Sequence, residues 1–268
     1  MPRARVWSVL AVLCLSGCAG KLPSATDVER KILAPTGVLR VGVYPGSPVS
    51  MVRDPASGQP KGISIGLGQA LASRLNVSFQ MVEFAKLTDV VDAVRESRVD
   101  MIVTNATAAR AQSMDFSDPI VEIEQGYLVT GDSQLASADE VDRAGIRVLV
   151  VQGSTSQASL PQKLTSASIS VAPTIGAAKD MLMRHQADAF ATQKSILYEV
   201  SDELPGSRVL RGRYGVEQIA VGIPKGRGAG LLALRRFAEE LKADGSVARL
   251  IETVGIRGTS VASARSSG

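Results

Sequence analysis

From Gly37 almost to its end, the chain alternates short apolar runs typical of β-strands with amphipathic segments typical of helices. Strands are predicted at 38–44, 77–84, 100–105, 126–130, 146–151, 169–172, 188–192 and 218–223. Helices are predicted at 63–76, 87–98, 175–187, 195–204, 230–243 and 246–254. A helix between two strands supplies the long crossover that parallel pairing requires. The pattern therefore predicts an α/β fold with mostly parallel sheets.

The composition fits a globular protein and argues against a nucleic-acid partner. The 268 residues suffice for one large domain or two small ones with a sizeable apolar core. The formal net charge is +4, but no cluster of Lys and Arg with interleaved aromatic residues stands out. Nucleic-acid binding is not predicted, because it requires such a basic patch.

The N-terminus resembles a bacterial lipoprotein signal peptide. Arg3 and Arg5 form a basic start, and residues 6–15 form an apolar stretch too short to span a bilayer stably. The motif Leu15-Ser16-Gly17-Cys18 then resembles a lipobox. We predict a signal peptide over 1–17, lipidation of Cys18 and a tether over 18–35. The alternative is an ordinary signal peptide with an incidental cysteine.

Few residues that carry catalysis or hold metals remain after the signal peptide. Cys14 would be removed and Cys18 would be bound to lipid, so no disulfide is expected. His185 is the only histidine, and without partners it is better explained as a helix residue than as a base. Phosphate-binding, nucleophile-elbow and dinucleotide motifs are missing. We expect neither an enzyme nor a bound metal or cofactor.

One segment combines a buried strand with polar side chains at its end. The strand at 100–105 runs into a turn where Asn105 and Thr107 offer hydrogen-bonding side chains. Arg110 follows closely enough for its guanidinium to fold back over the turn, and a guanidinium matches a carboxylate through two parallel hydrogen bonds. An arginine after a turn is also commonly a solvated or ion-paired surface residue.

Several motifs occur in an order that resembles a known family. They are Gly37-x-Leu39-Arg40-Val41-Gly42-Val43, Gly62-Ile63-Ser64-Ile65, Val99-Asp100-Met101-Ile102, Thr107-x-x-Arg110, Asp115-Phe116-Ser117-Asp118-Pro119, Val150-Val151-Gln152-Gly153-Ser154-Thr155, Ala187-Asp188-Ala189-Phe190 and Ile223-Pro224-Lys225-Gly226. Together they cover about residues 36 to 255 and resemble family 3 extracellular solute-binding proteins, the polar amino acid-binding components of ABC importers.

The resemblance implies a two-lobed clamp of the periplasmic-binding-protein type II, with two mixed sheets flanked by helices and two hinge strands. Lobe 1 is expected at 36–129 and 221–256, lobe 2 at 130–220, and a disordered tail at 257–268. It also implies a monomer that closes around a small, carboxylate-bearing solute and delivers it to ABC permease subunits in the membrane. The protein would then lie on the periplasmic or extracellular face.

The family's pattern also suggests ligand-binding positions. These are Arg110, Asn105, Val103, Thr107, Tyr44, Ser154, Thr155 and Gln193. Arg110 would hold the ligand carboxylate, helped by Asn105 and by backbone groups near Val103. Ser154 and Thr155 are either plain helix caps or ligand contacts, and Tyr44 either covers the ligand or belongs to the core.

The chain departs from the family where the ligand's ammonium is usually bound. Family members that bind α-amino acids commonly carry an aspartate at the position of Gln193, and here Lys194 follows it. A neutral amide forms no ion pair, and Lys194 would repel an ammonium if it pointed inward. An organic anion without an amine is therefore an open alternative to an amino acid.

Two other functions are open. The first is an enzyme of the prephenate or arogenate dehydratase type, which requires a general acid in the cleft. Glu83 and Glu217 are the acids to test, and each is expected at the surface. The second is a sensory module that presents its solute to a membrane receptor.

Overall fold

The computed structural model describes residues 25–263, and the elements follow the predicted alternation. The predicted signal peptide, Cys18 and residues 264–268 lie outside the described residues. The helices are α1 Asp27–Leu33, α2 Ile63–Leu75, α3 Leu87–Arg95, α4 Ala108–Ala111, α5 Thr155–Ser159, α6 Ile175–Met183, α7 Lys194–Asp202, α8 Gly228–Ala243 and α9 Ser246–Val254. The strands are β1 Val38–Val43, β2 Val52–Arg53, β3 Pro60–Lys61, β4 Ser78–Glu83, β5 Ile102–Asn105, β6 Met114–Phe116, β7 Val121–Val129, β8 Arg147–Val151, β9 Ser168–Ala172, β10 Ala189–Gln193, β11 Arg208–Val209, β12 Gly215–Pro224 and β13 Thr259–Val261.

The strands form sheets that contain both parallel and antiparallel pairs. β1 and β4 pair in parallel, and a parallel bridge from Val41 to Met101 leads from β1 toward β5. The larger sheet has the order β5-β12-β7-β10-β8-β9. Its outer pairs β8–β9 and β8–β10 are parallel, whereas β7 and β12 are antiparallel to each other and to their other neighbours. The α/β prediction is thus confirmed. The expectation of mostly parallel sheets is wrong, because β7 and β12 pair antiparallel with all their neighbours and β2 pairs antiparallel with β3.

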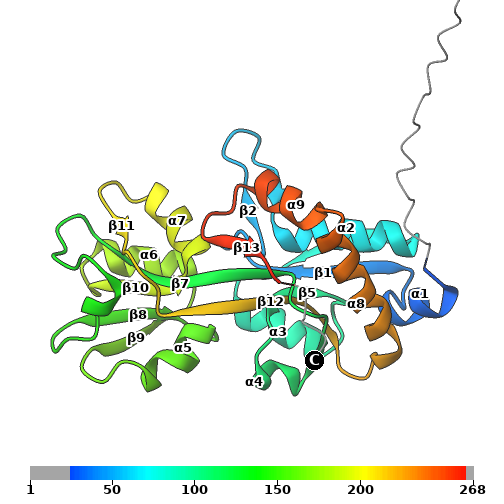
Figure 1. Ribbon diagram of the computed structural model, residues 1–268, viewed down its shortest axis with the longest axis horizontal. Coiled ribbons are helices and arrows are strands. Elements are labelled where there is room, and N and C mark those ends of the chain that lie inside the picture. Colours follow the sequence, from blue (N-terminus) through cyan, green and yellow to red (C-terminus); the bar gives the residue numbers. More distant parts are fainter. Residues whose placement is uncertain (1–24, 264–268) are drawn as a thin grey trace, which may run out of the picture.

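Two bodies of secondary structure are joined by the long strands β7 and β12, which run side by side between them (Figure 1). One apolar cluster packs β1, β5, the first residues of β7 and the last residues of β12 against α2, α8 and α9. Two further clusters pack β8 and β10 against α6 and α7 on one face and against the loops before β8 and β12 on the other. We call the first body lobe 1 and the second lobe 2.

Along both β7 and β12, the chain passes from one lobe to the other at an earlier residue than the predicted boundaries at 129/130 and 220/221. Leu128 and Val129 already pack in the core of lobe 2, while Ile219 already packs in the core of lobe 1. All three side chains are fully buried. The crossing segments are therefore the middle of β7 and the first half of β12.

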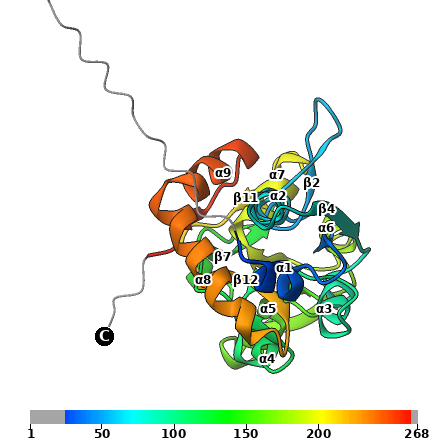
Figure 2. The ribbon, with the colours of Figure 1, turned by 90° about the vertical axis from the view of Figure 1, so that its right-hand side faces the viewer.

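Helices cover both sides of the strands in lobe 1. Figure 2 shows α8 and α9 on one side and α3 on the other. Phe237 of α8 is buried in the lobe 1 core, and burial of such a side chain contributes about 1.5–3 kcal/mol. The expected assignment of the last two helices to lobe 1 agrees with these contacts.

The predicted tether over 18–35 is wrong in its second half, because residues 27–33 form α1. Thr26 accepts the backbone N–H of Glu29, and the Glu29 carboxylate accepts that of Thr26, so a capping box starts the helix. Leu33 is buried in lobe 1, and the Arg30 side chain donates to the carbonyl of Leu75 at 2.7 Å. These contacts attach α1 to lobe 1.

The predicted disordered tail is wrong for its described part, residues 257–263. Thr259–Val261 forms β13, which pairs antiparallel with the lobe 1 end of β7, so a third strand lies beside the two crossing strands (Figure 1). Arg257 forms a salt bridge with Asp202 of α7 and lies over the Tyr198 ring at 4.8 Å. We call residues 257–262 the C-terminal strap, because they run from α9 of lobe 1 past α7 of lobe 2.

Candidate functional site

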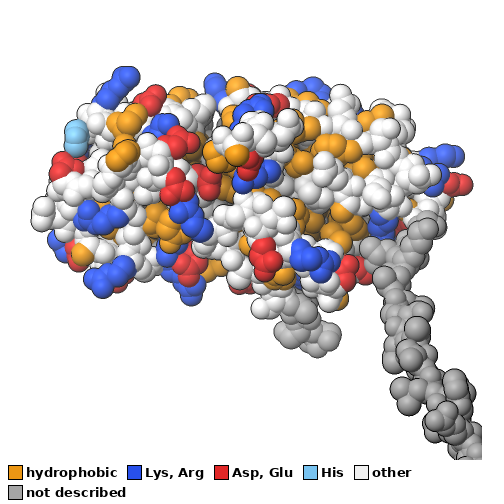
Figure 3. All heavy atoms as spheres, turned by 90° about the horizontal axis from the view of Figure 1, so that it is seen from above, with side chains coloured by type: hydrophobic (Ala, Val, Ile, Leu, Met, Phe, Trp, Pro, Cys, Tyr) orange, Lys and Arg blue, Asp and Glu red, His pale blue; other side chains and the backbone are white. Residues whose placement is uncertain are grey.

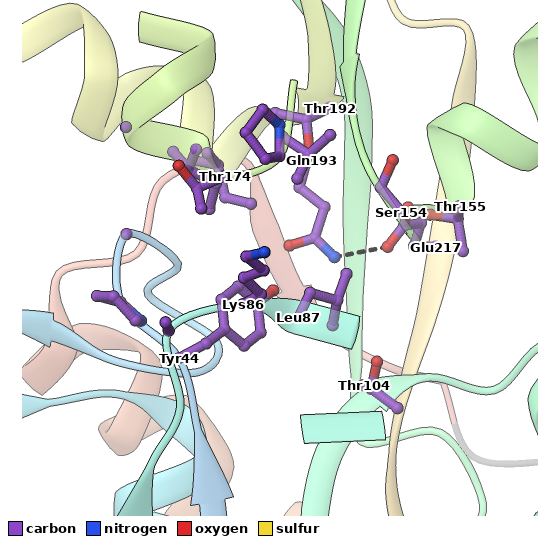
Figure 4. Close-up of a pocket in the computed structure, with 18 of the residues that line it drawn as sticks. Tyr44, Lys86, Leu87, Thr104, Ser154, Thr155, Thr174, Thr192, Gln193 and Glu217 are labelled. Atoms are coloured by element: carbon purple, nitrogen blue, oxygen red, sulfur yellow. Dashed lines mark hydrogen bonds between the residues drawn. The ribbon is translucent and has the colours of Figure 1, made fainter. Parts of the chain in front are cut away.

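A cavity of about 310 Å³ lies between the two lobes. Lobe 1 and the crossing strands supply Tyr44, Pro45, Gly46, Ala85, Lys86, Leu87, Thr104, Arg110 and Glu217 to its lining. Lobe 2 supplies Val151, Ser154, Thr155, Pro173, Thr174, Ile175, Gly176, Thr192, Gln193 and Ile196. Figure 4 shows the labelled side chains converging on this space from both sides. The volume is of the size that small-molecule sites usually have.

Arg110 lies in α4, directly after β5, and its guanidinium reaches the cavity. Its Nη1 donates to Thr104 Oγ1 at 2.6 Å and to the Asn105 carbonyl at 3.3 Å, and its Nη2 donates to the Gly153 carbonyl of lobe 2 at 3.1 Å. A guanidinium has five N–H groups, so two remain without an acceptor among the described residues. Burial lowers the pKa of Arg110, and the nearby Glu217 carboxylate opposes that shift. The group stays positively charged.

Glu217 is a buried carboxylate in the wall of the cavity, and the expectation of a surface position is wrong. It lies on β12, is only 4% exposed, and accepts hydrogen bonds from Gln125 Nε2 at 2.7 Å, Gln193 Nε2 at 2.5 Å and the Thr155 hydroxyl. Three donors converging on one carboxyl suit an ionised, acceptor-only group. The sequence indicates Glu217 only as a candidate general acid, because the residues that bind it are 24 to 92 positions away along the chain.

Gln193 has one polar side-chain atom in the cavity wall that forms no hydrogen bond. Its amide nitrogen is bonded to Glu217, while its Oε1 is buried and has no hydrogen-bond partner. In Figure 4 the Gln193 side chain extends into the cavity from β10. The amide oxygen and the Glu217 carboxylate together therefore offer acceptors to a cationic or hydrogen-bond-donating ligand group.

Tyr44, the first residue after β1, touches both lobes. Its side chain packs against an apolar cluster of lobe 2 and against the cluster beneath α3 in lobe 1. Burial raises the pKa of its hydroxyl, a shift that the charge of Arg110 opposes. Tyr44 thus lines the cavity and also packs between the lobes.

Ser154 and Thr155 line the cavity at the start of α5. The Ser154 hydroxyl accepts the backbone N–H of Gln157 at 3.1 Å, which is the geometry of a helix cap. The Thr155 hydroxyl is bonded to Glu217. Both hydroxyl oxygens therefore have partners within the protein.

Three residues expected at the site do not line the cavity. Val103 is buried in the middle of the sheet, where β5 pairs with β12 at Val221. Asn105 and Thr107 line a neighbouring open groove of about 800 Å³, and Thr107 caps α4. Because side chains alternate between the two faces of a strand, Thr104 rather than Val103 or Asn105 faces the cavity.

Of the two lysines near the site, the one considered from the sequence lies outside the cavity and the other, Lys86, lines it. Lys194 points away from the cavity: its Nζ is 2.6 Å from Glu124 Oε2, and Gly258 of the strap packs on its side chain. Lys86 lines the cavity instead, at the residue before α3. Because Lys194 does not point inward, the condition for its repulsion of a ligand ammonium is not met.

The two lobes are in close contact around the cavity. A Cβ atom on Gly153 would lie 2.7 Å from Cγ2 of Thr88 in lobe 1, and one on Gly46 would lie 3.3 Å from Ile175 in lobe 2. The Arg110–Gly153 hydrogen bond spans the same boundary. The structure is thus a closed arrangement in which a Cβ on Gly153 would collide with the opposite lobe and one on Gly46 would be in tight contact with it.

The described residues provide no group of three or more His, Cys, Asp or Glu side chains that could hold a metal ion. Over 25–263, none of the helices is long and apolar enough to cross a membrane. On the face shown in Figure 3, acidic and basic side chains are interspersed rather than gathered into a single-sign patch.

The chain matches a known protein family over most of its length. Residues 39–255 match the model of the bacterial extracellular solute-binding proteins, family 3. The chain is 25% identical to the ABC transporter glutamine-binding protein GlnH of Bacillus subtilis, over 89% of this chain and 90% of the relative.

Solved structures show the same fold. An amino acid ABC transporter substrate-binding protein from Streptococcus pneumoniae, bound to L-arginine, matches with a TM-score of 0.75 and 22% identity over 84% of this chain and 97% of the other. An ancestral amino acid-binding protein described as a precursor of cyclohexadienyl dehydratase matches with a TM-score of 0.72 and 24% identity over 85% and 99%.

Proposed function

Because the chain belongs to the bacterial extracellular solute-binding proteins, family 3, we propose that it captures an α-amino acid between its lobes for an ABC importer. The main observation behind this proposal is the lining of the cavity between the lobes. It contains the guanidinium of Arg110, two of whose N–H groups have no acceptor, and the hydrogen-bond acceptors of Glu217 and Gln193. An α-amino acid carries the two complementary charges on groups bonded to the same carbon atom.

The recognition chemistry follows from these groups. The two N–H groups of Arg110 that lack an acceptor would hold the α-carboxylate. The ammonium would lie against the Glu217 carboxylate and the Gln193 amide oxygen. Glu217 would then supply the negative charge that Gln193 lacks, so an amine-free anion is no longer needed to explain the neutral residue at that position.

Closure couples binding to transport. Lobe 1 contributes Arg110, lobe 2 contributes Gln193, and Glu217 lies on the crossing strand β12. A ligand that contacts both lobes is bound more tightly by the closed form and shifts the population toward it. Permease subunits that bind the closed form would receive the loaded protein in preference to the empty one.

The test is a thermal unfolding screen of the full 268-residue chain in mild detergent against the proteinogenic L-amino acids. A ligand at 100 times its Kd stabilises the native state by about 2.7 kcal/mol, which corresponds to roughly 5–10 °C for a chain of this size. Arg110→Ala should remove this shift, because loss of a buried charged hydrogen-bonding partner costs about 2–5 kcal/mol of binding.

The matched control is Arg184→Ala. Arg184 is exposed at the end of α6 and does not line the cavity, so its removal should leave the ligand-induced shift unchanged. If the Arg110→Ala chain kept a full shift, the guanidinium would not be the carboxylate site.

An enzymatic dehydratase function has weaker support. Glu83 is exposed, does not line the cavity, and is 3.3 Å from Arg53. Glu217 lines the cavity, but three donors from the protein already bind its carboxyl. A general acid must instead present a proton to the substrate. The ancestral binding protein among the matches shares the fold, and fold alone does not decide the reaction.

We further propose that the protein acts as a monomer outside the cytoplasm, attached to a membrane through lipidated Cys18. The family is extracellular, which supports the location. The motif Leu15-Ser16-Gly17-Cys18 supports the anchor. Delivery to a sensory receptor rather than to a permease would use the same closed form.

A further inference from the structure

The charged side chains that line the cavity do not balance. Arg110 and Lys86 are cationic and Glu217 is anionic, and the rest of the lining is uncharged. An α-amino acid with a neutral side chain brings one charge of each sign and leaves one positive charge over. A ligand with a second negative group would neutralise this surplus and gain a charge-assisted contact that a neutral side chain cannot form.

Lys86 is the cation that lacks a partner. It lies immediately before α3, and no ion pair or hydrogen bond joins it to another residue of the described chain. Its exposed position lets water solvate the ammonium while the cavity is empty. In Figure 4 its side chain extends toward Gln193 and Thr174 of lobe 2.

The wall opposite Lys86 is also electropositive. Thr174 caps α6 by accepting the backbone N–H of Ala177 at 3.0 Å, which leaves the N–H groups of Ile175 and Gly176 without an acceptor in the helix. Gly176 carries no side chain to obstruct an approach, and a Cβ there would have only Thr174 Oγ1 nearby, at 3.9 Å. Together with the Lys86 ammonium, this helix start would surround a carboxylate from both lobes.

We propose, on the premise that the cavity binds an α-amino acid, that its ligand has a second carboxylate at the end of its side chain. Lys86 binds that carboxylate and makes the protein select acidic amino acids of the aspartate and glutamate class over their amides. The α-carboxylate goes to Arg110, the ammonium to Glu217 and the distal carboxylate to Lys86, which balances the charges of the lining.

The test measures Kd by calorimetry on the full chain in detergent for two isosteric pairs, glutamate with glutamine and aspartate with asparagine. In the unmodified protein, the better-fitting acid should bind at least about tenfold more tightly than its amide. In Lys86→Ala this ratio should fall toward one, mainly through weaker binding of the acid. Lys86→Arg should retain most of the preference, because it keeps the charge.

The control is Lys31→Ala, which removes an exposed lysine of α1 outside the cavity and should leave both affinities unchanged. If no amino acid binds the unmodified protein, the proposed function fails and the inference falls with it. If amino acids bind but the amide is held as tightly as the acid, or if Lys86→Ala keeps the ratio, the inference alone is overturned.

Discussion

At the residue scale, the function of a charged side chain here depends on which neighbours reach it. Arg110, Glu217 and Lys194 are all strongly charged, yet the first two line the cavity while Lys194 pairs with Glu124 outside it. Glu124 also accepts from Arg213 at 2.8 Å, so it binds two cations, and these lower its pKa. Residue type alone could not separate these roles, because each depends on contacts between distant segments.

Cys18 gives a prediction at the same scale. Cys18→Ser removes the thiol that a lipoprotein transferase would modify, so the protein should move from the membrane to the soluble fraction after cell fractionation. Cys14→Ser, in the apolar stretch, is the control and should leave the distribution unchanged. Continued membrane association of the Cys18→Ser chain would refute the anchor.

At the element scale, the strap adds a third connection beside the crossing strands β7 and β12. β13 follows β7 in register from Thr259 opposite Ile123 to Val261 opposite Val121. Just before it, Arg257 binds Asp202 of α7. A segment held to both lobes limits how far they can separate, so the strap should influence opening as well as stability. Three residues of strand are too few to form without these partners.

Arg257→Ala should therefore release the strap from α7. The expected loss of unfolding free energy is small, about 1 kcal/mol, since the ion pair is partly exposed and is supplemented by the stacking on Tyr198. Hydrogen exchange should accelerate in the amides of 257–262 and stay constant in the core strands. Arg249→Ala, in α9 of the same lobe, should not change exchange in the strap. Unaltered protection after Arg257→Ala would show that α7 does not hold the segment.

At the scale of the whole molecule, closure depends on the small size of the residues where the lobes meet. Gly153 has φ +74° and carries the carbonyl that accepts from Arg110, and its Cα faces Thr88. Gly46 has φ +88° and faces Ile175. A side chain at Gly153 would hold the lobes apart, and the ligand would lose the contacts that only the closed form provides.

Gly153→Ala should weaken amino acid binding by tenfold or more, because its Cβ would collide with Thr88 Cγ2 in the closed form. Gly145→Ala is the matched control: Gly145 has φ +88° but nothing within 4 Å of a new Cβ, so it shares the backbone strain without the collision. Both should lose about 1–2 kcal/mol of fold stability. Adding Thr88→Ser to Gly153→Ala removes the colliding methyl and should restore affinity. Equal binding by the two alanine variants would exclude a role for Gly153 in closure.

The sequence by itself determined the local elements and their order. Apolar periodicity located nearly every long helix and core strand within a few residues, because it reflects which faces must be buried. It also located Arg110 after a buried strand, at the place where the structure has it. The exceptions have local causes. The helix predicted over 175–187 ends at Met183, and His185 takes a left-handed conformation with φ +53°.

Only the tertiary structure decided which side chains meet. Glu217 becomes a buried acceptor because Gln125, Thr155 and Gln193 converge on it from three other elements. Lys86 lines the cavity, whereas Lys194 pairs with Glu124 outside it and packs against Gly258 of the strap. Residues 257–262 carry no strand-like periodicity, yet they pair with an edge of β7. Such pairings depend on distances between segments far apart in the chain, which no local pattern encodes.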